Sequence, residues 1–156
     1  AEGTPKFGHN YGYDVLVGGS TFNDYDTHPG KVISLSKKGI RSSAAGRYQF
    51  LERTYKGLSG RVDLLDPEKR KLFADGFTPS EQDRAARYLA HITRKVKYGD
   101  IRAAIESKSG TENLSRKLMK EWSSWPNPST GISFYNRQGA RSIEKIHRKL
   151  QQNYKQ

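Results

Sequence analysis

The spacing of apolar residues changes at about residue 43, and this change limits the folds that the chain can adopt. Residues 5–40 are rich in Gly, Asp, Asn, Pro and Ser and show little helical periodicity, whereas from residue 43 onward apolar residues recur at helical spacing. Two apolar runs in the first part, at residues 15–17 and 31–36, predict short strands. The order of elements therefore predicts an α+β fold.

A chain of 156 residues is long enough for one core, and no linker or repeat divides it. We expect a single domain over residues 1–156. It comprises a small β lobe at about 12–40 and a mainly helical lobe at about 43–156, with a cleft between them.

Capping residues mark several helix starts in the second part. Asp66 and Thr78 each stand directly before a proline, which is favoured at the first helical position, and Glu81 is placed to complete a capping box with Thr78. Asp100 can cap a further helix, and another must end before Pro126. The apolar stripes behind these starts predict the buried faces. They are Ala85, Tyr88, Leu89, Ile92 and Val96; Ile101, Ala104 and Ile105; Leu114, Leu118 and Trp122; and Ile143, Ile146 and Leu150.

Residues 42–50 join small residues to an arginine, a tyrosine, a glutamine and a phenylalanine. The apolar spacing predicts a helix capped by Ser42 or Ser43, with Tyr48 and Gln49 in its first turns beside a tight loop. A flat ring and an amide at that place suit a ligand rich in hydroxyl and acetamido groups. The alternative is an ordinary junction between loop and helix with one buried tyrosine.

Composition excludes several classes of function. The chain has no cysteine, which excludes disulfides and thiolate sites, and no apolar run approaches the roughly 20 residues that span a bilayer. The four histidines lack metal-ligand spacing, and neither a phosphate loop nor a dinucleotide fingerprint is present, so we expect no metal and no cofactor. The net charge of +12 is spread along the chain and favours polyanionic partners, although a merely soluble basic surface is the alternative.

Six segments, taken together and in order, resemble the phage lambda lysozyme family, whose members cleave peptidoglycan. They are Glu2–Gly3–Thr4; Gly12 to Gly19; Phe22, Asp24–Tyr25 and His28–Pro29; Ser42 to Phe50; Phe77 to Ser80 with Gln82–Asp83; and Gly99 to Arg102. The resemblance covers most of the chain and is weakest at residues 56–76 and 103–121. It implies a lysozyme-like fold.

The resemblance implies that Glu2 is the catalytic acid. Lambda-like enzymes resemble lytic transglycosylases, in which one carboxyl group protonates the leaving oxygen and then takes a proton from the sugar's 6-hydroxyl, giving a 1,6-anhydro ring. The alternative is a muramidase that uses water and needs a second carboxylate, for which Asp14, Asp24 and Asp26 are the candidates. Tyr11 stands where T-even phage lysozymes carry an aspartate, so that pattern is not matched.

Substrate contacts are expected from residues within the resembling segments and from two aromatic residues near the Pro-Asn-Pro turn, which falls where the family lines its cleft. They are Tyr13, Asp14, His28, Tyr48, Gln49, Trp125 and Phe134. Three alternatives stay open from the residues alone: Asp14 as a turn or strand-edge acid, His28 as a staple within its loop, and Trp125 as a core residue in place of a ring that stacks on sugar.

The chain departs from the family at its start. In the family the glutamate lies near the end of a first helix, whereas here only Ala1 precedes Glu2. We therefore expect that upstream residues were removed or numbered away, or that the helix is supplied from elsewhere.

The features together predict a phage-type endolysin that cleaves the MurNAc–GlcNAc bond of peptidoglycan glycan strands. It is expected to be a monomer that stays in the host cytoplasm until lysis and then acts on the cell wall. No nucleic-acid-binding signature is present, so no specific nucleic-acid partner is expected, and a non-catalytic relative that binds polyanions or the wall is the alternative. The last helix carries Arg141, Lys145, Arg148 and Lys149, which favour contact with an anionic outer membrane or simply form a solvated basic face.

Overall fold

The computed structural model describes residues 10–35, 39–122, 124–133 and 141–154. Residues 153 and 154 are described by their backbone alone. The chain forms two compact units, Ala1–Tyr88 and Leu89–Gln156. Each unit is described by itself below.

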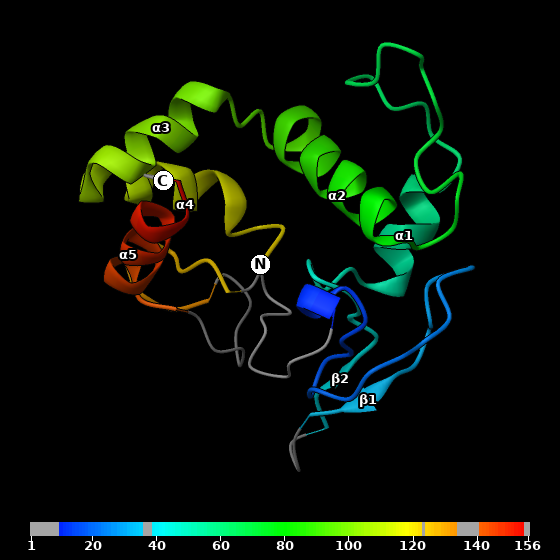
Figure 1. Cartoon of the computed structure of the whole chain (residues 1–156). Coiled ribbons are helices and arrows are strands. Elements are labelled where there is room, and N and C mark those ends of the chain that lie inside the picture. The colour runs from blue at the N-terminus through cyan, green and yellow to red at the C-terminus, as the bar shows by residue number, and fades with distance from the viewer. Residues whose placement is uncertain (1–9, 36–38, 123, 134–140, 155–156) are drawn as a thin grey trace. The chain divides into compact units, whose positions relative to one another are not determined.

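Helices dominate the second unit, whereas the described residues of the first lie mostly in turns and loops, together with short helices and one small sheet (Figure 1). The first unit contains η2 (Asn10–Gly12), β1 (Ile33–Ser34), β2 (Arg41–Ser42), α1 (Glu52–Leu58) and α2 (Pro79–Tyr88). The second contains the π-helix η3 (Leu89–Thr93), α3 (Tyr98–Glu106), α4 (Lys108–Leu118) and α5 (Ile143–Tyr154).

The β structure is smaller than the sequence predicts. β1 pairs with β2 in antiparallel register, with Ile33 opposite Ser42. The predicted strand at residues 15–17 forms only isolated bridges, of which one joins Val15 to Thr21. The chain turns back at two glycines directly after this run, and Leu16 N–H donates to Ser20 O at 2.7 Å, so the turn is too tight for a longer ladder.

The helix predicted from residue 43 is wrong in its start, because α1 begins at Glu52. Gly46 and Gln49 have φ angles of +76° and +51°, which no helix accommodates. Tyr48 therefore lies in a tight loop before the helix, not in its first turn. The N-cap residue of α1 is Leu51, whose side chain makes no capping bond, while Ser43, from the preceding loop, accepts a hydrogen bond from Glu52 N–H with its Oγ at 3.1 Å.

The two proline-marked starts have different outcomes. α2 begins at Pro79 as predicted. The start predicted at Asp66 is wrong: the chain there forms a turn, in which Asp66 Oδ1 accepts from Glu68 N–H at 2.9 Å and Lys69 has a φ of +56°. Glu81 is predicted to complete a capping box, but its Oε1 instead forms an ion pair with Arg84 at 2.5 Å.

An aromatic cluster forms the core of the first unit. Phe77 is fully buried and lies at its centre. The rings packed against Phe77 are Phe22, His28, Phe50, Tyr55 and Phe73. Burial of these rings helps to hold α1 and the loops before it in place.

The predicted apolar stripes form the core of the second unit. Val96, Ala104, Leu114 and Leu118 are buried together, and the partly buried residues packed on them include Trp122 and Trp125. They belong to α3, to α4 and to the segments before α3 and after α4, and Leu150 of α5 packs on the same core. α4 ends before Pro126, as the sequence predicts. Asp100 is the N3 residue of α3, and its Oδ2 accepts from the N–H of the N-cap residue Lys97 at 2.7 Å, as in a capping box.

Within the described residues, no helix combines the length and the apolar content that crossing a bilayer requires.

Candidate functional site

Two tyrosines that the sequence analysis selects meet at one carboxylate in the first unit. Tyr13 Oη donates to Asp83 at 2.9 Å from either carboxylate oxygen, and Tyr48 Oη donates to Asp83 Oδ1 at 2.8 Å. Tyr13 follows η2, Tyr48 lies in the loop before α1, and Asp83 lies on α2. Three segments that are distant in sequence therefore share one hydrogen-bonded cluster, here called the tyrosine–aspartate cluster.

Gln82, the neighbour of Asp83, holds the three segments together. This side chain is fully buried; its Oε1 accepts from Arg47 N–H at 3.0 Å and its Nε2 donates to Tyr13 O at 3.0 Å and to Phe77 O at 2.8 Å. Gly46 allows this approach, because a Cβ at that position would overlap the Gln82 amide. The cluster is therefore fixed by a buried amide with all its polar atoms bonded.

Charge and burial keep the two phenols protonated. Burial raises the pKa of Tyr48, and the hydrogen bond to Asp83 and the charge of Asp83 raise it further. The same causes raise the pKa of Tyr13. The Arg47 guanidinium lies 5.1 Å from the centre of the Tyr13 ring and makes a cation–π contact with it. The result is a rigid surface of two phenols, one carboxylate and one guanidinium, which suits hydroxyl and amide groups.

Gln49 lies next to this cluster, but its side chain is directed to the protein backbone. Its Nε2 donates to Gly46 O at 2.9 Å and to Val15 O at 3.2 Å. These bonds stabilise the loop that carries Tyr48. The geometry shows that the Gln49 side chain helps to hold the loop. A substrate contact through its amide remains a prediction.

His28 is buried, with 5% of its surface exposed, and both of its ring nitrogens are bonded. Nδ1 accepts from Gly30 N–H at 3.0 Å, so the proton lies on Nε2, which donates to Phe50 O at 2.8 Å. Burial lowers the pKa of His28 and favours this neutral form. This arrangement is the loop staple that the sequence left open, and a role in binding substrate remains a prediction.

The candidate second carboxylates differ in their surroundings. Asp14 is 9% exposed, and its Oδ1 has no hydrogen-bond partner among the described residues. Asp24 is exposed and its Oδ1 accepts from Asp26 N–H at 2.8 Å, so it closes a turn. Asp14 is thus the one of these three acids that the fold buries.

The remaining predicted residues lie elsewhere or outside the described residues. Trp125 belongs to the second unit, where it is half-buried against the core of α3 and α4. Glu2 and Phe134 lie outside the described residues. In the described part of the chain, no group of three or more histidine and acidic side chains is arranged to hold a metal ion.

Sequence reasoning missed the functions of Gln82 and Asp83, which it treated only as part of a helix start. The available signal was the position of two polar residues within the first turns of α2, where Gln82 faces the core and Asp83 faces solvent. Helical spacing alone does not show which other loops such side chains meet.

Comparison with known proteins gives one family. The family model described as "Endolysin" matches residues 1–156. The endolysin of Escherichia phage lambda is 38% identical over 102 residues, which are 62% of this chain and 56% of that protein, so the match spans little more than half of the relative. The solved lysozyme from bacteriophage lambda is similar at 26% identity and a TM-score of 0.63, covering 94% of this chain and 77% of that one. A bacteriophage lambda lysozyme complexed with a chitohexasaccharide is similar at 25% identity and a TM-score of 0.60, covering 92% and 78%.

Proposed function

The chain belongs to the endolysin family, and from this premise we propose that it cleaves the MurNAc–GlcNAc glycosidic bond of bacterial peptidoglycan. Its fold is that of lambda lysozyme, mainly helical with a small two-stranded sheet, as the sequence resemblance predicts. The observation that carries the proposal is the family match over residues 1–156, which includes Glu2. A similar lysozyme bound to a chitohexasaccharide supports a glycan chain as the ligand.

We propose Glu2 as the single acid and base of a lytic transglycosylase. Its carboxyl group gives a proton to the glycosidic oxygen as the bond from that oxygen to C1 of MurNAc breaks. The resulting carboxylate takes a proton from the 6-hydroxyl of the same sugar, whose oxygen bonds to C1. A 1,6-anhydro ring forms, Glu2 is protonated again, and water is not consumed.

The surroundings of the other acids separate the candidates for the second carboxylate that hydrolysis needs, and Asp26, like Asp24, is exposed. Asp83 is engaged by Tyr13 and Tyr48, and Asp24 closes a turn. Asp14 is then the remaining candidate for activating water in the alternative muramidase reaction, and its unbonded Oδ1 makes it the acid to test.

The tyrosine–aspartate cluster is proposed as a contact surface for the glycan. Hydroxyl and acetamido groups match the phenols of Tyr13 and Tyr48 and the guanidinium of Arg47. Trp125 and Phe134 are proposed to add apolar contacts to sugar rings. The charge of +12 would favour approach to a wall that carries peptide carboxylates, once the protein leaves the host cytoplasm at lysis.

Digestion of purified sacculi, followed by mass spectrometry of the muropeptides, tests the reaction. The expected products carry 1,6-anhydro-MurNAc ends, which are lighter by one water than reducing ends. Reducing ends in their place would reject the transglycosylase and leave a muramidase.

Glu2→Gln tests the acid itself, because the amide keeps the shape and cannot supply the proton. We expect sacculus digestion to be lost while the circular dichroism spectrum is unchanged. Asp14→Asn is the matched variant: retained anhydro products support one acid, and a loss equal to that of Glu2→Gln would show that a second carboxylate is needed. Digestion by the Glu2→Gln protein would end the assignment.

A further inference from the structure

The connection between α1 and α2 contains a hairpin at residues 60–72 (Figure 1). Gly60 N–H donates to Leu72 O at 3.0 Å, and Leu72 N–H donates to Arg61 O at 2.8 Å. Val62 and Lys71 form an antiparallel bridge, and Asp63 N–H donates to Arg70 O at 2.9 Å. This segment lies where the sequence resembles the lambda family least.

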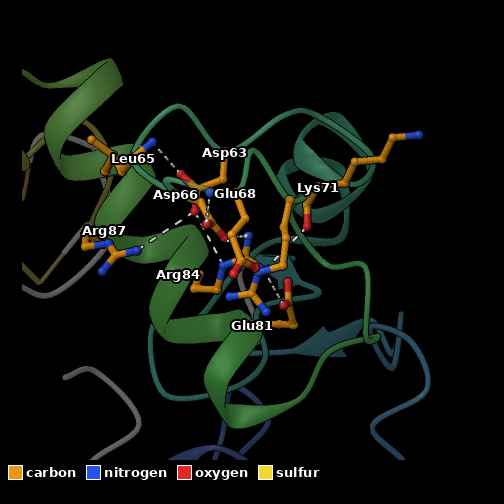
Figure 2. A network of polar contacts seen from close by, with 9 residues as sticks. Asp63, Leu65, Asp66, Glu68, Lys71, Glu81, Arg84 and Arg87 are labelled. Atoms are coloured by element: carbon orange, nitrogen blue, oxygen red, sulfur yellow. Dashed lines mark hydrogen bonds and ion pairs between the residues drawn. The ribbon is translucent and has the colours of Figure 1, made fainter.

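The side of the hairpin that faces α2 is charged and buried (Figure 2). Asp63 and Asp66 reach the Arg84 guanidinium from the hairpin, at 3.4 Å and 3.2 Å, and Glu81 reaches it from α2 at 2.5 Å. Asp63 is fully buried, and Arg84 and Asp66 are each more than nine-tenths buried. Arg87 adds a longer contact of 3.9 Å to Asp63. These ion pairs fix one face of the hairpin against the helix.

The exposed side chains of the hairpin are apolar and mainly basic, with Glu68 as an exposed acid that lies 3.8 Å from Arg70. Val62 and Leu64 are 44% and 55% exposed, and they flank the buried Asp63. Lys71 lies directly opposite Val62, and residues opposite each other in an antiparallel pair share a face. Arg61, Lys69 and Lys71 are also exposed. The usual order is inverted, because two aliphatic side chains face solvent while the charges next to them are buried.

This inversion has a physical cost that a partner would offset. The ion pairs offset the desolvation of the buried charges within the protein, whereas exposing Val62 and Leu64 forgoes a gain that a partner covering them would recover. Exposed aliphatic side chains on a segment that also exposes lysine and arginine match an anionic lipid surface, where the aliphatic groups enter the acyl boundary and the cations meet phosphates. A soluble polyanion would use the cations and leave the aliphatic pair unused.

We propose that the hairpin at residues 60–72 is a docking element for anionic phospholipid membranes, with Val62 and Leu64 inserted at the surface and Arg61, Lys69 and Lys71 on the headgroups. The Arg84 ion pairs hold the hairpin so that these side chains stay outward. The inference is independent of the glycosidic reaction proposed above, because binding to vesicles requires neither Glu2 nor a glycan. Loss of one activity would therefore leave the other measurable.

Sedimentation with vesicles of phosphatidylglycerol and phosphatidylethanolamine tests the proposal. Val62→Ser with Leu64→Ser should weaken the apparent affinity about tenfold, since two exposed aliphatic side chains lose their burial in the bilayer. Ile132→Ser is the matched control, because Ile132 is 60% exposed and lies outside the hairpin. It should change the affinity less than about twofold. Equal binding by wild type and the double serine variant would overturn the proposal.

A pair of charge variants separates the hairpin from the charge of the whole protein. Lys69→Glu with Lys71→Glu should weaken binding about tenfold or more, since each cation near an anionic membrane contributes about 1 kcal/mol. Lys31→Glu with Lys95→Glu changes the net charge equally at exposed positions outside the hairpin and should have a smaller effect. Equal losses in the two variants would assign binding to the overall charge and contradict the proposal.

Site-specific labelling reports insertion directly, because the chain has no cysteine of its own. An environment-sensitive fluorophore on Leu64→Cys should shift to the blue when anionic vesicles are added, and the same fluorophore on Ile132→Cys should not. No shift at position 64, or an equal shift at position 132, would reject the hairpin as the inserted element.

Discussion

Asp83 shows how one exposed carboxylate organises two residues that sequence analysis selects separately. Tyr13 and Tyr48 are 35 residues apart, and neither predicts the other. Both phenols donate to Asp83, and the amide of Gln82 fixes the backbone beneath them. The chemistry proposed for the two rings therefore depends on a carboxylate that sits between them.

Asp83→Asn is predicted to lower the pKa of both phenols. The substitution removes the negative charge that raises them, and burial, the larger cause, remains, so the pKa of Tyr48 should still exceed the ordinary value near 10. A phenol whose pKa is raised in the folded state stabilises the fold below about pH 10, and this stability is lost as pH rises through the folded-state pKa. The variant has less of this stability to lose, so its free energy of unfolding should fall less than that of the wild type at high pH. Alkaline titration by ultraviolet absorbance and by unfolding measures both effects.

Tyr48→Phe identifies the Tyr48 contribution in that titration, and Asp75→Asn, an exposed aspartate, is the control. Identical phenol titrations in wild type and Asp83→Asn would contradict the proposal that the charge of Asp83 raises the pKa of these tyrosines.

Gly46→Ala should destabilise the protein more than Gly60→Ala, although both glycines have φ near +80°. At Gly60 a Cβ meets nothing within 4 Å, so only the left-handed conformation is penalised, by about 1 kcal/mol. At Gly46 it displaces the Gln82 amide and breaks its three hydrogen bonds, so we expect a loss of about 2–4 kcal/mol in the free energy of unfolding. Urea unfolding compares them, and equal losses would mean that Gln82 adapts without cost.

At the scale of elements, the sequence predicts long helices well and the structure before α1 poorly. Repeated apolar spacing indicates a helix whose packed face is long, as in α4 and α5. The early start predicted for α1 is wrong because Gly46 and Gln49 adopt left-handed conformations, which the buried contacts of Gln82 and Gln49 stabilise. Such contacts join distant segments and leave no periodic signal.

Asp66 gives the same lesson for caps. An aspartate before a proline is a good start signal for a helix, and here Asp66 instead caps a turn and pairs with Arg70 and Arg84. A buried guanidinium 18 residues further along the chain competes for the carboxylate, and local pattern does not contain that partner.

Arg84→Met is predicted to lower the free energy of unfolding far more than Arg87→Met does. The first change leaves Asp63, Asp66 and Glu81 buried without their shared cation, which should cost about 3–5 kcal/mol of unfolding free energy. Arg87 is half-exposed and distant, so its loss should cost under about 1 kcal/mol.

The Arg84→Met penalty should also depend on pH. The hydrogen bond from Arg70 is the main cause of the lowered pKa of Asp66, and the charge of Arg84 lowers that pKa further; the variant loses the Arg84 part, so its penalty should shrink as pH falls. Urea unfolding at neutral and acidic pH measures this, and equal stabilities of the two variants at neutral pH would show that the network contributes no net stability.

Gly110→Ala tests the contact between α3 and α4. A Cβ at Gly110 would overlap Ala103 O and lie 2.7 Å from Ala104 N, so the two helices must separate. The separation also strains the bond of 2.6 Å from Thr111 Oγ1 to Ala104 O. We expect a loss of about 3 kcal/mol in thermal or urea unfolding.

Gly99→Ala is the control on α3, where a Cβ meets nothing within 4 Å. It should be neutral or stabilise the protein by up to about 1 kcal/mol, because alanine favours the helix. A Gly110 variant as stable as this one would show that the helices yield without cost.

At the scale of the whole molecule, composition and the family resemblance predict more than periodicity does. The α+β class and the lysozyme-like fold are confirmed, because the order of motifs carries them. The single-domain organisation, the cleft and the catalytic part of Glu2 remain predictions. Tyr13 and Tyr48 are brought together as a contact surface would require, while their partner Asp83 was found only from the packing of α2.

The net charge of +12 leads to a prediction about the molecule as a whole. Glu2→Gln protein should adsorb to purified sacculi strongly at low salt and progressively less as salt rises, because the Debye length falls from about 10 Å at 0.1 M to about 3 Å at 1 M. Because Glu2→Gln is expected to lack activity, it should leave the sacculi intact during sedimentation. Sacculi with amidated carboxylates should bind weakly even at low salt, since the anionic partner is removed. Adsorption that neither salt nor amidation changes would mean that sugar contacts, such as those proposed at the tyrosine–aspartate cluster, hold the protein to the wall without help from its charge.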